Sequence, residues 1–205
     1  MTFEDYMFTY IHSDVFSLFF ITNNNEMNSK YRITPPERLT SMKTIVLTNV
    51  GKGQLSSLDI VNPVVSIRDK YSSGATVPGT PGRRVLHLCF FAIDHMPSVA
   101  DQDKLSKDNV RDIINLIKLS ADEGKEKIYF QCSEGRIRSY TLATMLADIH
   151  SFTDEGILAL KDITVQYSNK DSLVKQGITD KKTAALIEQY VEELNKEHQE
   201  NCVNV

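Results

Sequence analysis

Short apolar runs separated by polar loops dominate the pattern along the first two thirds of the chain. Five of these runs are rich in β-branched or aromatic residues, and they predict strands at residues 15–21, 44–47, 63–67, 85–93 and 127–132. The later runs are uninterrupted, which is typical of strands buried on both faces of a sheet. The strongest breaks, at residues 23–36 and 71–84, are rich in asparagine, glycine and proline and predict loops.

Apolar residues at helical spacing appear chiefly in the second half. The stripe at positions 110, 113, 114 and 117 predicts a helix with Ser106 or Ser120 at its boundary, and positions 142, 145, 146 and 149 predict a second. A third run, at residues 157–160, is short. A last stripe runs from 186 to 194, with Thr179 as its predicted N-cap. The order of elements predicts an α/β fold: a central, mostly parallel sheet of four to five strands flanked by helices.

Composition and charge narrow the functional classes. The 205 residues, 41% apolar and 24% charged, fit one domain spanning 1–205, with 1–40 as an N-terminal extension or edge elements, 41–150 as the core and 151–205 as C-terminal helices. A net charge of −4 gives no general attraction to nucleic acid, so we expect no nucleic-acid partner and local binding of any anion. The apolar runs are too short for a membrane span. Three scattered cysteines favour a reducing, cytoplasmic compartment over a disulfide scaffold or a zinc site.

The most informative stretch places a cysteine at the end of a predicted strand and an arginine at the start of a predicted helix. Between Cys132 and Arg138 lies a five-residue loop with Gly135 at its centre. Backbone N–H groups of a tight loop and of a helix N-terminus have no partners of their own and attract anions, and a guanidinium matches two phosphate oxygens. A sulfur over such a cradle is favoured as thiolate. The pattern therefore predicts a nucleophile aimed at a bound phosphate. The alternative is a core cysteine, but chance recurrence of the full pattern is on the order of one in a thousand.

With Gln131-Cys132 followed by five residues, Arg138 and Ser139, the sequence from 63 to 149 resembles the cysteine-dependent protein tyrosine phosphatases, especially the small dual-specificity branch. The resemblance implies a protein tyrosine phosphatase-like fold, a catalytic Cys132, and a Ser139 hydroxyl that eases departure of the thiolate. It implies a phosphate-binding loop formed by Ser133, Glu134, Gly135, Arg136, Ile137 and Arg138. Gln131 departs from the family pattern, which has histidine before the cysteine. The mechanism of the family needs no metal or cofactor.

The family also uses an aspartate as general acid, on a loop after the preceding strand. Asp94 is our preferred candidate because it follows the strand predicted at residues 85–93, although it lies farther from Cys132 in sequence than is usual. Asp101 and Asp103 are the alternatives, nearer the usual spacing but without the strand-end context.

The resemblance implies a phosphoprotein phosphatase acting on phosphotyrosine, with phosphoserine and phosphothreonine as further substrates. Alternatives are a phosphoinositide, inositol phosphate or RNA 5′-triphosphate phosphatase, or a weakly active phosphate-binding module. Arg136 is compatible either with a polyanionic substrate or with an ordinary pair to Glu134. Cys89 is a candidate resolving thiol for Cys132, and otherwise a core residue.

Overall fold

The computed structural model describes residues 9–12, 15–18, 43–56, 61–68, 83–96, 98–149, 163–174 and 176–203. The chain divides into two compact units, Met1–Leu39 and Thr40–Val205. In the first unit, β1 (Thr9–His12) and β2 (Val15–Leu18) pair as an antiparallel hairpin. Of the strand predicted at residues 15–21, the described residues 15–18 therefore pair within this hairpin and not in the central sheet.

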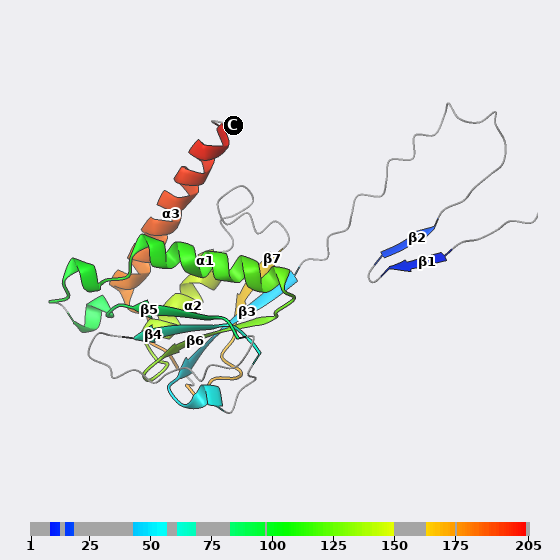
Figure 1. The fold of residues 1–205 in the computed structure, drawn as a ribbon. Helices are drawn as coiled ribbons and strands as arrows, with labels where there is room; N and C mark the ends of the chain where they lie inside the picture. The colour runs from blue at the N-terminus through cyan, green and yellow to red at the C-terminus, as the bar shows by residue number, and fades with distance from the viewer. Residues whose placement is uncertain are drawn as a thin grey trace, which may run out of the picture. The chain divides into compact units, whose positions relative to one another are not determined.

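The second unit contains a five-stranded sheet in which every pair of neighbours is parallel, in the order β5-β4-β6-β3-β7 (Figure 1). The strands are β3 (Lys43–Gly51), β4 (Val64–Arg68), β5 (Val85–Cys89), β6 (Lys127–Cys132) and β7 (Ile163–Tyr167). The predicted α/β class and the parallel central sheet are confirmed.

Strand boundaries follow the predictions in part. The strand β6 matches its predicted range, whereas β3 runs past the predicted end at 47 as far as Gly51. The strand β5 ends at Cys89 instead of 93. Phe90 still donates its N–H to the carbonyl of Arg68 at 3.1 Å, and the chain leaves the sheet after this residue. The edge strand β7 was not predicted. Its five residues lie in the region expected to be helical and pair only with β3.

Alternate residues of the central strands face two different apolar clusters. On β6, Ile128, Phe130 and Cys132 belong to the main cluster, whereas Tyr129 belongs to a smaller one with Leu55. The main cluster also contains buried residues of three helices, α1 (Lys107–Asp122), α2 (Arg138–Ile149) and α3 (Lys181–Val203). Because the side-chain period of a strand is two, these helices cover one face of the sheet, and Cys132 lies on that face (Figure 1).

Three single turns of 3-10 helix connect these elements: η1 (Gln54–Ser56), η2 (Ile93–His95) and η3 (Asp101–Asp103). The turn η2 follows β5 at the end of the sheet where β6 also ends, since both strands run in the same direction. The turn η2 therefore lies at the same end of the parallel strands as the loop after Cys132.

The helix ends show which polar side chains cap them. Ser106 caps α1 as predicted, in a capping box with Asn109, and the helix continues past Ser120. The helix α3 begins at Lys181, and its cap is Asp180, whose Oδ1 accepts from the N–H of Thr183 at 2.8 Å. The predicted cap, Thr179, was therefore wrong by one residue.

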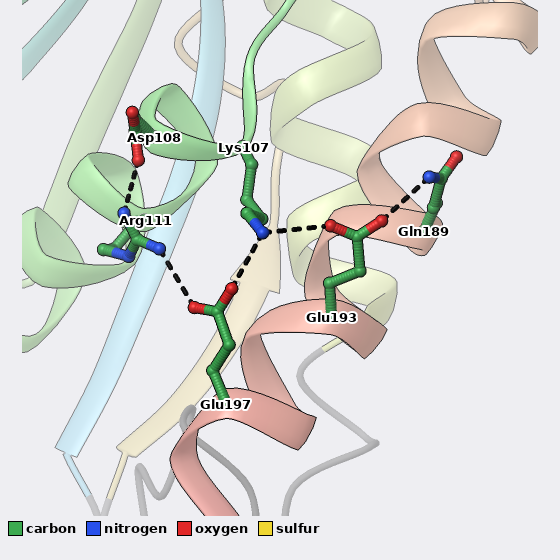
Figure 2. Close-up of polar contacts among 6 residues, drawn as sticks. All are labelled: Lys107, Asp108, Arg111, Gln189, Glu193 and Glu197. Carbon is green, nitrogen blue, oxygen red and sulfur yellow. Dashed lines mark hydrogen bonds and ion pairs between the residues drawn. The ribbon is translucent and has the colours of Figure 1, made fainter. Parts of the chain in front are cut away.

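An ion-pair network joins α1 to α3 on the surface (Figure 2). Lys107 Nζ lies 2.8 Å from Glu197 Oε1 and 3.2 Å from Glu193 Oε2. Arg111 lies 3.1 Å from the other oxygen of Glu197 and also pairs with Asp108. The two carboxylates of α3 therefore bind the first turns of α1.

The predicted helix at residues 157–160, the loop at 23–36 and residues 71–82 of the second loop lie outside the described residues. Within the described part of the chain, no helix has the length and apolar character needed to cross a membrane.

Candidate active site

Cys132 is the last residue of β6, and its side chain is 5% exposed. Its Sγ accepts a hydrogen bond from the N–H of Gly135 at 3.2 Å and lies 3.2 Å from Ser139 Oγ. Ser139 is fully buried in the first turn of α2. A backbone amide therefore donates to this sulfur, and a hydroxyl lies within hydrogen-bond distance of it.

The loop after Cys132 turns its carbonyl groups outward. The carbonyl of Ser133 accepts from the N–H of Lys52 at 3.0 Å, and that of Arg136 accepts from the N–H of Ile178 at 2.8 Å. The carbonyl of Gly135 accepts from the side chain of Asn49 at 2.7 Å. Because these carbonyls are engaged on the outside, the intervening N–H groups face the inner side of the turn, as in an anion-binding nest.

Gly135 is required by both its conformation and its surroundings. Its φ is +75°, in the left-handed region. A β-carbon there would lie 2.6 Å from the backbone nitrogen of Gly51 and 2.7 Å from the carbonyl carbon of Val50. The loop therefore packs directly on the end of β3, which only glycine permits.

Asn49 holds the loop from behind. It is fully buried on β3, where its Nδ2 donates to Gly135 and its Oδ1 accepts from the Tyr167 hydroxyl at 2.6 Å. Burial raises the pKa of Tyr167 to about 12, so this hydroxyl stays protonated and remains a donor. The ring of Tyr167 in turn packs edge-on against Tyr140 of α2, with centroids 5.7 Å apart.

Arg138 has a fixed orientation. One terminal nitrogen donates to the carbonyl of Phe90 at 3.3 Å, and the other donates to Ser133 Oγ at 3.0 Å. The guanidinium is therefore held across the mouth of the loop by a group on either side, as a two-pronged anion clamp requires.

These groups open into a cavity of about 240 Å³. Five of the six predicted phosphate-binding residues line it together with Cys132; the sixth, Gly135, is buried behind them. The lining is completed by Phe91, Ala92, His95 and Met96 from the segment after β5. The cavity thus has a polar floor and a largely apolar wall.

The three candidate acids lie elsewhere. Asp94 does not line the cavity: its Oδ2 accepts from the N–H groups of Lys181 at 2.7 Å and Lys182 at 3.3 Å, at the start of α3. Asp101 is 95% exposed at its side chain and pairs with Lys104, whose hydrogen bond and charge lower the pKa of Asp101. Asp103 is half-buried on η3 and is not part of the lining.

Two further residues at the site carry a signal in the sequence. Asn49, together with Thr48, is a polar residue within an otherwise apolar strand, and His95 directly follows the candidate acid. A buried amide within a strand needs hydrogen-bond partners, which marks it as a structural anchor. His95 lines the cavity where Asp94 does not.

The order of strands in the sheet separates Cys89, the candidate resolving thiol, from Cys132. Cys89 is exposed at the end of β5, Cys132 ends β6, and β4 lies between these strands. Two strand spacings make about 10 Å, beyond the roughly 7 Å over which two α-carbons can be joined by a disulfide. This geometry does not allow Cys89 to resolve an oxidised Cys132.

In the part of the chain that the structure describes, no three histidine, cysteine, aspartate or glutamate side chains gather as metal ligands. Comparison with family models, curated proteins and solved structures gives no significant match to this chain.

Proposed function

We propose that this protein is a cysteine-dependent phosphatase of the small dual-specificity type, which hydrolyses phosphate monoesters on proteins through a cysteinyl-phosphate intermediate. The observation that carries the proposal is that Cys132, whose sulfur accepts a hydrogen bond from the N–H of Gly135, and Arg138 line the same cavity. A single-cysteine nucleophile, an amide cradle and a fixed guanidinium are the parts that metal-free phosphoryl transfer needs.

The first step transfers the phosphoryl group to sulfur. The Cys132 thiolate attacks phosphorus in line, the sulfur–phosphorus bond forms, and the bond from phosphorus to the leaving oxygen breaks. Loop N–H groups and Arg138 stabilise the charge on the three equatorial oxygens. Because their positions are fixed by outward hydrogen bonds of the loop, they need little reorganisation during the reaction.

The second step releases phosphate. Water attacks phosphorus on the side opposite sulfur, and the thiolate leaves. Ser139 Oγ, 3.2 Å from Sγ, donates a hydrogen bond to the departing thiolate and so lowers the barrier to its departure.

The leaving oxygen also needs a proton. Asp94 is the acid expected from sequence, and it would have to release the N–H groups of Lys181 and Lys182 before it could act in the cavity.

The apolar wall supports an aromatic substrate. Phe91, Ala92, Met96 and Ile137 line the cavity beside the phosphate cradle. An aryl group attached to the bound phosphate removes this apolar surface from water, whereas a phosphoserine side chain contributes little apolar area. Phosphotyrosine is therefore the preferred substrate in this proposal, and phosphothreonine and phosphoserine come second.

Arg136 favours a second candidate, a substrate with a further anionic group. It is exposed and lines the cavity beside the phosphate cradle. A guanidinium at this position can bind a second phosphate of an inositol phosphate, a phosphoinositide or an RNA 5′-triphosphate. A panel of these compounds against a phosphotyrosine peptide ranks the two candidates by kcat/KM.

The test of the function is hydrolysis of 4-nitrophenyl phosphate in the presence of a metal chelator. We expect Cys132→Ser to lower turnover by about 10⁴-fold or more, because no comparable nucleophile remains. Cys89→Ser, which changes the exposed cysteine, is the matched control and should leave turnover unaltered. Acid quenching should trap phosphate on Cys132.

Turnover that survives in Cys132→Ser would show that this cysteine is not the nucleophile. Tight binding of inorganic phosphate with no turnover by the wild type would favour the phosphate-binding module instead.

A further inference from the structure

Few groups at the cavity can give a proton to a leaving group. Among the described residues that line it, Arg136 and Arg138 stay charged at all relevant pH values, and Cys132 serves as the nucleophile. His95 and Glu134 remain. Glu134 lies on the loop that binds the phosphate oxygens, whereas His95 comes from η2, on the apolar wall where the rest of the substrate fits.

Asp94 is held away from this position by two sets of hydrogen bonds. Its carboxylate binds the first N–H groups of α3, and its own N–H donates to Asp180 Oδ2 at 2.9 Å. Lys182 Nζ, 3.7 Å from Asp94 Oδ1, adds an ion pair to these contacts.

Asp180 lies within ion-pair distance of His95. Its side chain is 1% exposed, and its Oδ2 lies 3.6 Å from His95 Nδ1. Asp180 is itself fixed, because its Oδ1 accepts from the N–H of Thr183 and its N–H donates to Thr141 Oγ1 at 2.9 Å. With Nδ1 directed at a buried carboxylate, Nε2 is the ring nitrogen left for the cavity.

We propose that His95, oriented by Asp180, is the general acid of this site. The proposal rests on the phosphatase function proposed above. In the first step the imidazolium gives its Nε2 proton to the leaving oxygen as the sulfur–phosphorus bond forms, which releases an alcohol or phenol and leaves neutral imidazole. In the second step the imidazole takes a proton from the attacking water, the sulfur–phosphorus bond breaks, and thiolate, phosphate and imidazolium are regenerated.

The test compares leaving groups that differ in their need for a proton. Phenyl phosphate releases a basic phenolate and depends on the acid, whereas 4-nitrophenyl phosphate releases a weakly basic one. We expect His95→Gln to lower kcat/KM for phenyl phosphate by about 10²- to 10³-fold and that for 4-nitrophenyl phosphate by less than about tenfold. Asp94→Asn is the matched comparison and should affect the two substrates equally.

Asp180 is a positioning residue in this scheme, and Asp180→Asn tests it. Asparagine is also a good N-cap and keeps the acceptor for Thr183, so α3 should remain in place. We expect a loss that is larger for phenyl phosphate, and no additional selective loss when Asp180→Asn is combined with His95→Gln. If the role of Asp180 were purely structural, Asp180→Asn would lower kcat/KM for both substrates by the same factor, and this loss would add to that of His95→Gln.

The outcomes separate this inference from the proposed function. If the wild type hydrolyses both esters and His95→Gln lowers kcat/KM for both by the same factor, His95 is not the acid and the phosphatase proposal still stands. A selective loss in Asp94→Asn instead would return the role to Asp94. Absence of any Cys132-dependent turnover would remove the function and, with it, this inference.

Discussion

Asp94 and Asp180 are joined by a hydrogen bond between η2 and the start of α3: the N–H of Asp94 donates to Asp180 Oδ2 at 2.9 Å. The two residues are 86 positions apart in sequence. In a second contact, Asp94 Oδ2 accepts from the N–H of Lys181, the next residue after Asp180, at 2.7 Å. Together these hydrogen bonds join η2, which contributes His95 to the cavity lining, to the start of α3.

Removing the Asp180 carboxylate should destabilise the protein. Asp180→Ala leaves the buried N–H of Thr183 and the partly buried N–H of Asp94 without their acceptors, so we expect a loss of about 2–4 kcal/mol in the free energy of unfolding. Asp180→Asn should lose less, since an amide oxygen still caps the helix. Urea unfolding measures both.

Asp101→Ala provides the control. Its side chain is 95% exposed and pairs only at the surface with Lys104. We expect a change within about 0.5 kcal/mol. If Asp180→Ala lowered the free energy of unfolding no more than Asp101→Ala does, the contact between η2 and α3 would contribute nothing to stability.

Asn49 should matter for anion binding although it does not line the cavity. Asn49→Ala removes the donor that holds the carbonyl of Gly135 outward and leaves Tyr167 without its acceptor. We expect the affinity for inorganic phosphate to fall by about 10- to 100-fold, in line with the loss of 1–3 kcal/mol from buried unsatisfied groups. Titration calorimetry measures this affinity directly.

Tyr167→Phe separates the two ends of this chain of hydrogen bonds. It removes only the donor to Asn49 Oδ1 and leaves the contact to Gly135 in place. We expect a smaller loss of phosphate affinity than for Asn49→Ala. Equal losses in both variants would show that the contact to Gly135 does not organise the loop.

The extent to which this site could be predicted depends on distance along the chain. The residues from Cys132 to Ser139 are contiguous, so one strand end, one loop and one helix start define their geometry, and local pattern was sufficient. Asn49 reaches Gly135 across 86 positions, and nothing in either neighbourhood specifies that contact. The pairing of β3 with β6 creates it.

Asp94 and His95 show a different limit. Sequence context pointed to the segment after β5, but η2 is a 3-10 turn, in which successive side chains diverge by about 120°. Adjacent residues therefore face different surroundings, α3 for Asp94 and the cavity for His95. Pattern cannot choose between them.

For the fold, β-rich composition predicted strands but not their partners. Residues 15–18 of the predicted run pair with β1, and the fifth strand of the sheet is the short β7. Both segments can form a strand, and only the tertiary partner decides which one joins the sheet.

Two glycines with similar backbone conformations allow the steric requirement at the loop to be isolated. Gly135 and Gly124 have φ of +75° and +68°, and only at Gly135 would a β-carbon meet another group. Alanine at either position should lose about 1–2 kcal/mol from the left-handed conformation. Gly135→Ala should lose more, because Gly51 and Val50 lie within 2.7 Å of the new carbon.

Thermal unfolding and phosphate binding measured on both variants test this. We expect Gly124→Ala to bind phosphate as the wild type does and Gly135→Ala to bind it at least tenfold more weakly, because the loop must move off β3. Unaltered binding by Gly135→Ala would contradict the close packing of the loop on that strand.

The carboxylates that join α3 to α1 should make stability depend on pH. Hydrogen bonding to Lys107 lowers the pKa of Glu197, and hydrogen bonds from Gln189 and Lys107 lower that of Glu193 (Figure 2). A folded-state pKa below the unfolded value, near 4.3, means that this contribution is complete above about pH 5 and is lost as the pH falls through the folded-state pKa. Glu197→Gln should therefore lower the unfolding midpoint at pH 7 and have little effect near pH 3.

Glu192→Gln, on an exposed position of the same helix, is the control and should change the midpoint at neither pH. Because these side chains are solvent-accessible, 1 M salt should also reduce the difference between Glu197→Gln and the wild type. A difference that is constant across pH and salt would show that Glu197 acts through packing and not through its charge.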